Sequence, residues 1–139
     1  MRLIQSGFSV AVIMASLLVT DLTASEVIGV KSAVVPVYPT LAHKAHHEAD
    51  MKAQVKVTPS GSVSDVVIVE SNALFDYAVI GAVKQWRFTA DSSERTVEVK
   101  FSFRLLPRDA EEHELGVTLD LPGQVEVREK LPPKLESYP

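Results

Sequence analysis

The hydrophobic pattern in the middle of the chain changes period twice, and each change predicts a different element. Residues 50–58 alternate apolar and polar side chains, and one apolar face holds Met51, Ala53, Val55 and Val57. A Pro-Ser-Gly-Ser sequence at 59–62 then leads into a second apolar run at 62–70. Alternation with a period of two indicates a half-buried strand, and a short glycine turn between two such runs predicts a β-hairpin.

The next stretch, residues 71–88, has the period of a helix. Its apolar face repeats at i, i+4, i+7 and i+11 through Phe75, Val79, Ala82 and Trp86. Such a stripe predicts an amphipathic helix that packs on a core, and Asn72 is expected to be its N-cap. Strict alternation returns at 96–106 and predicts a further strand.

A short helix is also expected at 40–48, because Pro39 suits the first turn of a helix, where its missing N–H has no partner. Together these elements predict an α+β fold. A small antiparallel three-stranded sheet, with the chain order β-β-α-β, is expected to pack against the Trp86 face of one main helix. The short helix precedes this unit, and an extra β-hairpin follows it.

The extra hairpin is predicted in the C-terminal part of the chain. Residues 107–114 read as an acidic linker, and two apolar runs then flank a Leu-Pro-Gly-Gln turn at 121–124. Because a lone hairpin is only marginally stable in water, it is expected to pack on the main sheet, pair with another chain or stay loosely ordered. The expected organisation is therefore a domain at 37–106, followed by linker, hairpin and proline-containing tail at 107–139.

Residues 1–25 have the layout of a secretory signal: one cation at Arg2, an uncharged apolar stretch, and small residues before an expected cleavage after Ser25. The competing interpretation is an uncleaved membrane anchor. The apolar stretch from Leu3 to Val19 lies at the short end of the range of about 17–25 residues that cross a bilayer. Under both interpretations the remainder of the chain is carried across the membrane.

Composition narrows the possible function classes. The 139 residues include no cysteine, which excludes disulfides, thiolate catalysis, zinc-cysteine sites and iron–sulfur clusters. The formal net charge is −4, from 14 Lys and Arg against 18 Asp and Glu, so no nucleic-acid-binding surface is expected. The sequence contains no recognisable set of nucleophile, base and orienting residue, and we therefore predict neither an enzyme nor a cofactor.

Three histidines are the weak candidates for a metal site. His43, His46 and His47 fall on one face of the predicted short helix. The H-E-x-x-H pattern of zinc proteases is absent, because Met51 stands where the second histidine would be. We interpret the cluster as a solvated helix flank, and keep an exported metal-dependent enzyme as the third functional hypothesis.

Several short motifs occur in a characteristic order: a Tyr-Pro pair before the short helix, a glycine turn, and a Trp-Arg-Phe sequence closing the main helix. Their residues are Tyr38, Pro39, Gly61, Val63, Trp86, Arg87 and Phe88. In this order and at these spacings, residues 37–106 resemble the C-terminal periplasmic domain of the TonB family of energy transducers.

The resemblance implies a protein-binding function in TonB-dependent transmembrane transport. In the family, this domain captures a short segment of an outer-membrane receptor as an extra strand beside its own last strand. An exposed sheet edge suits this role, because its main-chain groups are unpaired. The resemblance also implies a periplasmic location, with the domain anchored in the inner membrane if the signal is not cleaved. The implied binding edge consists of Thr96, Val97, Glu98, Val99, Lys100, Phe101, Ser102 and Phe103.

Two features of family transducers are missing near the N-terminus. Family members carry a membrane helix with a functional histidine and a long proline-rich spacer. Here no histidine lies between Met1 and Ala42, and a single proline lies between Thr20 and Val37. The alternative function is therefore a stand-alone periplasmic interaction module without energy coupling. Such a module could be a homodimer made by pairing sheet edges, with the C-terminal hairpin occupying the binding groove.

Overall fold

The computed structural model describes residues 29–133, so the expected signal or anchor at 1–25 lies outside the described residues. None of the helices in this range is long and apolar enough to cross a membrane. The elements are β1 (Val30–Ser32), α1 (Thr40–Lys44), β2 (Ala49–Val57), β3 (Val63–Ile68), α2 (Asp76–Val83), β4 (Arg87–Phe88), β5 (Arg95–Leu106), the 3-10 helix η1 (Glu112–Glu114), β6 (Gly116–Asp120) and β7 (Gln124–Lys130).

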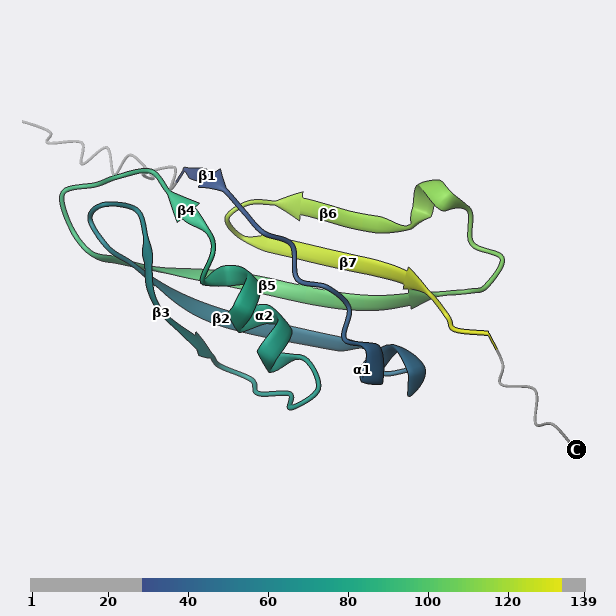
Figure 1. Cartoon of the computed structure of the whole chain (residues 1–139). Helices are drawn as coiled ribbons and strands as arrows, with labels where there is room; N and C mark the ends of the chain where they lie inside the picture. Colours follow the sequence, from purple (N-terminus) through teal and green to yellow (C-terminus); the bar gives the residue numbers. More distant parts are fainter. Residues whose placement is uncertain (1–28, 134–139) are drawn as a thin grey trace, which may run out of the picture.

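The main sheet has five strands in the order β3-β2-β5-β7-β6, and β1 pairs with β4 in a separate two-stranded sheet (Figure 1). Strand β7 runs parallel to β5, whereas the other neighbours in the main sheet are antiparallel. The predicted fold class is therefore wrong. The sheet is mixed and five-stranded instead of antiparallel and three-stranded, and the expected extra hairpin is part of it.

Strands β2 and β5 form the centre of the sheet, because each carries an unbroken alternation of apolar and polar side chains. The apolar residues of both strands are buried on one face: Ala49, Met51, Ala53, Val55, Val57, Val97, Val99, Phe101 and Phe103. Helix α2 and the segment between β1 and α1 pack on this face (Figure 1). The opposite face of the sheet carries mostly polar and charged side chains.

The C-terminal hairpin joins the sheet because it has an apolar face of its own to bury. Val125 is fully buried and Val127 is 4% exposed, and their Cα partners in β5 are Phe101 and Phe103. These valines extend the buried face of β5 by one strand. A period of two predicts that such a face is buried, but it specifies neither the neighbouring strand nor the direction of pairing.

Both helices are shorter than predicted. Helix α1 ends at Lys44, and α2 spans only the middle of the predicted 71–88 helix. Asn72 is not the N-cap: it opens a turn in which its carbonyl accepts the N–H groups of Phe75 and Asp76. The chain leaves the helix before Trp86, because the buried Phe88 belongs to β4, which pairs with β1. That pairing partner is distant in sequence.

Candidate functional site along strand β5

Strand β5 contains the eight residues of the expected binding edge, and one of its flanks is fully paired. It forms an antiparallel ladder with β2 that runs from the Ala49–Phe103 pair to the Val57–Arg95 pair. The side chains of four residues point into the core and anchor the strand there: Val97, Val99, Phe101 and Phe103. The other four residues of the edge lie on the polar face of the sheet.

Strand β7 covers the second flank of β5 over Lys100–Leu106. The N–H of Lys100 donates to the carbonyl of Gly123, and the carbonyl of Leu106 accepts the N–H of Leu131, both at 2.9 Å. Even-numbered residues of β5 therefore direct their main-chain groups toward β7, and odd-numbered residues of β7 direct theirs toward β5.

The expected edge is thus divided into an occupied half and an open half. Lys100–Phe103 lies beside β7, whereas Thr96–Val99 has no strand on this flank in residues 29–133. Continuing the alternation, the main-chain groups of Thr96 and Glu98 point toward the open half of the flank. The structure therefore leaves a short stretch of unpaired main chain immediately before the point where β7 begins.

The occupied half shows which kind of strand this flank accepts. In β7, Val125 and Val127 enter the core, while Glu126 and Arg128 lie on the polar face and make an ion pair at 3.3 Å. The flank therefore accepts an extended, parallel segment with apolar side chains two residues apart. Main-chain bonds hold such a segment, and the alternate side chains discriminate between segments.

Two contacts fasten the end of β7. The Nε2 atom of His43, in α1, lies 2.6 Å from the carbonyl oxygen of Lys130, which fits a hydrogen bond with the ring nitrogen donating. The Nε of Arg108 donates to the carbonyl of Pro132 at 2.9 Å. Docking of the hairpin therefore depends on α1 and on the linker after β5, as well as on the β5 ladder.

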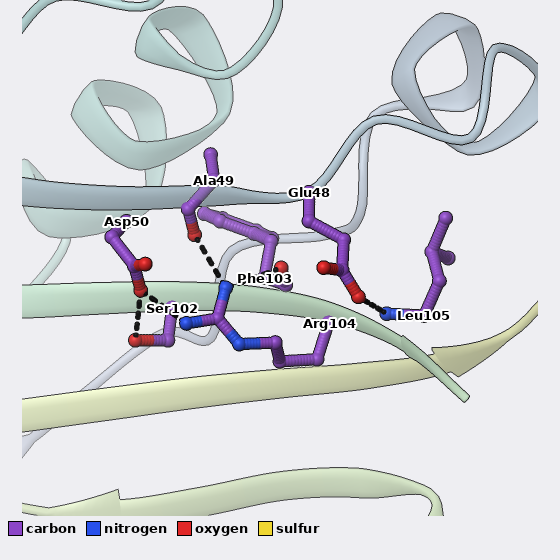
Figure 2. Close-up of polar contacts among 7 residues, drawn as sticks. All are labelled: Glu48, Ala49, Asp50, Ser102, Phe103, Arg104 and Leu105. Carbon is purple, nitrogen blue, oxygen red and sulfur yellow. Dashed lines mark hydrogen bonds and ion pairs between the residues drawn. The ribbon is translucent and has the colours of Figure 1, made fainter.

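Polar side chains join the ends of β2 and β5 (Figure 2). Asp50 accepts hydrogen bonds from Ser102 at 2.9 Å and from the guanidinium of Arg104 at 2.6 Å. The carboxylate of Glu48 accepts the N–H of Leu105 at 2.8 Å. The Asp50–Arg104 pair is partly exposed, and exposed pairs contribute only about 0–1 kcal/mol. The pair connects the first residues of β2 to the last residues of β5, where the two strands are in register.

The three histidines named as weak metal candidates have different surroundings in the structure. His43 is engaged with the Lys130 carbonyl, and His46 and His47 are exposed. In residues 29–133, no group of three or more His, Cys, Asp or Glu side chains is placed to hold a metal ion. The role of His43 at the end of β7 could not be read from the sequence, because its partner lies 87 residues away.

The motif residues build the core beneath β5. The Tyr38 ring makes edge contacts with Phe75 and Phe103, at centroid distances of 5.7 and 5.5 Å. Its hydroxyl donates to the carbonyl of His47. Burial raises the pKa of Tyr38 to about 12, and the carboxylate of Glu48 contributes to the rise. Tyr38 therefore stays protonated as a hydrogen-bond donor over the physiological pH range.

Trp86 and Gly61, two further motif residues, form hydrogen bonds that hold neighbouring segments of the chain in place. The indole N–H of Trp86 donates to the carbonyl of Val34 at 2.8 Å, which fixes the segment that crosses the core. Gly61 has φ +92°, and its carbonyl accepts the N–H of Phe88 at 2.7 Å. Other motif members lie at the periphery of this core: Pro39, Val63 and the exposed Arg87.

A sequence profile described as "Gram-negative bacterial TonB protein C-terminal" matches residues 34–105, which is more than half of the chain. The chain belongs to this family. TonB C-terminal domains are protein-interaction domains of the Gram-negative envelope, associated with TonB-dependent transport, and they interact with outer-membrane receptors. The family is not one of known enzymes.

A solved structure supports the assignment. The solution NMR structure of the Pseudomonas aeruginosa TonB C-terminal domain is 27% identical and superposes with a TM-score of 0.50. The match covers 55% of this chain and 85% of that chain. No curated protein sequence matches this chain. Since the family match ends at residue 105, β6 and β7 lie outside it.

Proposed function

We propose that this TonB-family domain captures an extended segment of an outer-membrane receptor by strand addition beside β5. The proposal rests on one observation, the docking of β7 on the flank of β5. This strand is an extended segment, docked in parallel on the flank of β5, that buries two alternate side chains. A receptor segment of the same pattern would use the same main-chain groups, from Thr96 onward.

The proposal gives the β6–β7 hairpin a definite role. Because it occupies Lys100–Leu106, a receptor segment longer than the open stretch at Thr96–Val99 must displace it. The hairpin is then a built-in competitor, and the apparent affinity falls with the fraction of molecules in which it is undocked. Residues 1–25 would export the domain to the periplasm or anchor it there in the inner membrane.

A second function is favoured by the same occupancy. A domain whose hairpin never leaves β5 would be a stand-alone periplasmic interaction module without energy coupling. The two functions differ in one property: capture at β5 requires a mobile hairpin, whereas the stand-alone module keeps it docked. An engineered covalent link between β5 and β7 distinguishes them.

The link is the double variant Lys100→Cys/Gln124→Cys. These residues are exposed and are Cα partners in the parallel ladder. Neighbouring strands lie about 4.8 Å apart, within the range of about 4.4–6.8 Å that a disulfide spans between Cα atoms. The chain has no other cysteine. The probes are synthetic peptides that represent the N-terminal segments of outer-membrane receptors, and binding is measured by calorimetry.

Capture at β5 predicts that the reduced variant binds a receptor peptide and that the oxidised variant binds it at least about tenfold more weakly. The control link is Gln54→Cys/Val67→Cys, an exposed pair that joins β2 to β3 toward the opposite edge of the sheet. Its oxidation should leave binding unchanged. Equal binding by reduced and oxidised Lys100→Cys/Gln124→Cys would refute capture at β5, and no binding by either form would favour the stand-alone module.

A further inference from the structure

Strand β6 forms an exposed edge of the main sheet that lies outside the family match. All five of its residues are exposed. Val117 and Leu119 are Cα partners of Val127 and Val125, so their side chains lie on the same face of the sheet as the core. They are nevertheless 39% and 46% exposed. The apolar face of the sheet therefore extends past the elements that bury it and remains exposed at the β6 edge.

The main-chain groups that face outward from β6 can be assigned. Odd-numbered residues of β7 bond to β5, so the even-numbered ones bond to β6. Thr118 is the Cα partner of Glu126 and therefore faces β7. The N–H and C=O groups of Val117 and Leu119 consequently point away from the sheet. The two residues with exposed apolar side chains are thus also the two with free main-chain groups.

This edge has only part of the usual protection against strand pairing, because it is five residues long and its one charged residue, Asp120, lies at its end. Edge strands are commonly blunted by lysine, proline or a β-bulge, and the Gly-Val-Thr-Leu-Asp sequence of β6 has neither lysine nor proline. Its ladder with β7 is in continuous register. The opposite edge, β3, has a register shift in its ladder with β2 and carries Asp65 in its middle. The β3 edge also exposes an apolar residue, Val67, but beside Gln54 on the polar face. The two edges therefore differ in ladder regularity and in central charge, and β6 is the better suited to pairing.

We propose that a second copy of the chain binds this edge, with its β6 antiparallel to the first across a two-fold axis at Thr118. In that register Val117 of one copy lies opposite Leu119 of the other. These are the residues with free main-chain groups, so the pairing forms about four hydrogen bonds. The inference concerns a different edge from capture at β5 and stands independently of it.

The sequence of β6 is compatible with itself in this register. Apolar Val117 and Leu119 face each other on the core side, Thr118 faces its own copy, and Asp120 faces Gly116. Apolar and Thr–Thr cross-strand pairs are favourable, and the register places no like charges directly opposite each other. The two apolar pairs combine into one cluster on the core side of a continuous sheet.

The dimer should be weak and reversible. A five-residue edge is far smaller than the standard interface of about 20–30 residues on each side. We therefore expect dimers to form at protein concentrations of roughly 0.1–1 mM, in the range of affinities for small interfaces. A covalent trap detects such a weak complex at lower concentration.

The trap is Thr118→Cys, which places the only thiol of the chain on the proposed axis. Cα atoms in a non-hydrogen-bonded antiparallel pair are about 4.5 Å apart, which a disulfide can span. Mild oxidation should convert the variant to a covalent dimer, read by non-reducing electrophoresis. Asp120→Cys is the register control, because four residues of offset separate the two thiols by about 13 Å or more. Ser64→Cys is the control on the exposed face of the β3 edge.

We expect Thr118→Cys to cross-link at least about tenfold faster than either control. Sedimentation equilibrium gives the second measurement, without any engineered thiol. The average mass of the unmodified chain should rise with concentration, and Thr118→Lys, which places two lysines on the axis, should remain monomeric. Equal cross-linking rates in all three cysteine variants would overturn the proposal. A monomeric mass for the unmodified chain at millimolar concentration, or open-ended aggregates in place of dimers, would overturn it as well.

Discussion

Replacing Val125 by alanine tests how the hairpin and a captured segment compete. Val125 is fully buried beside Phe101. The change removes the equivalent of two methylene groups, at about 0.8 kcal/mol each, and the cavity left behind brings the cost to about 2 kcal/mol. Val125 contributes to the core only while β7 is docked. The loss therefore falls on the docking equilibrium of the hairpin.

The magnitude converts directly into a binding effect. Since 1.4 kcal/mol is a factor of ten in an equilibrium constant, about 2 kcal/mol raises the undocked population roughly 25-fold. While the docked form dominates, apparent affinity for a receptor peptide rises by the same factor. The variant should therefore be less stable and should also bind more tightly. Calorimetry measures the affinity, and chemical denaturation measures the stability.

The matched control is Val57→Ala. Val57 is also a fully buried valine, but it lies in β2, beside β3 and the start of β5, away from β7. It should lower stability by a similar amount, about 2 kcal/mol, without tightening binding. Unchanged peptide affinity in Val125→Ala, or an equal rise in affinity in Val57→Ala, would contradict competition between the hairpin and the captured segment.

Four further predictions concern stability, three in the core beneath the site and one on the exposed face of α2. Gly61→Ala should lower the unfolding free energy by at least about 2 kcal/mol, because its Cβ would lie 2.0 Å from the carbonyl oxygen of Phe88. Thermal unfolding should show Gly81→Ala, where a Cβ meets nothing within 4 Å, to be neutral or stabilising by about 0.5–1 kcal/mol. Trp86→Phe should cost about 1–3 kcal/mol through the unpaired Val34 carbonyl and lost volume, and circular dichroism during denaturation checks this. Because the pKa of Tyr38 is raised in the folded protein, its contribution to stability is complete below pH 10.0 and is lost as pH rises to about 12. Chemical denaturation at several pH values across that range should show this loss of stability. In Tyr38→Phe the same pH dependence should be absent.

The sequence located the strands whose alternation is long and unbroken. The buried face of β2, from Met51 to Val57, and that of β5, from Val97 to Phe103, are the ones expected. Such patterns are reliable because alternate side chains of a strand point to opposite faces. The helix boundaries were less predictable, because the pairing of β4 with β1 ends the helical conformation before Trp86. The local periodicity of a sequence does not reveal a pairing partner that is so distant along the chain.

The same limit explains the error in fold class and the incomplete description of the site. Val125 and Val127 signal one buried face, and their period says nothing about a parallel neighbour. The residues that settle the matter are distant contacts: Phe101 and Phe103 across the ladder, and His43 at its end. All eight residues of the expected edge lie in β5, but the pairing of Lys100–Phe103 with β7 could be found only from the three-dimensional arrangement.

Amide hydrogen exchange, with and without a saturating receptor peptide, shows whether β7 and the captured segment use one flank of β5 in turn. On binding, the amides of Val125 and Val127 should lose protection, while those of Lys100 and Ser102 should keep it, because the peptide replaces β7 as their hydrogen-bond partner. Unchanged or increased protection of Val125 and Val127 in the complex would contradict the account and place the peptide on another edge.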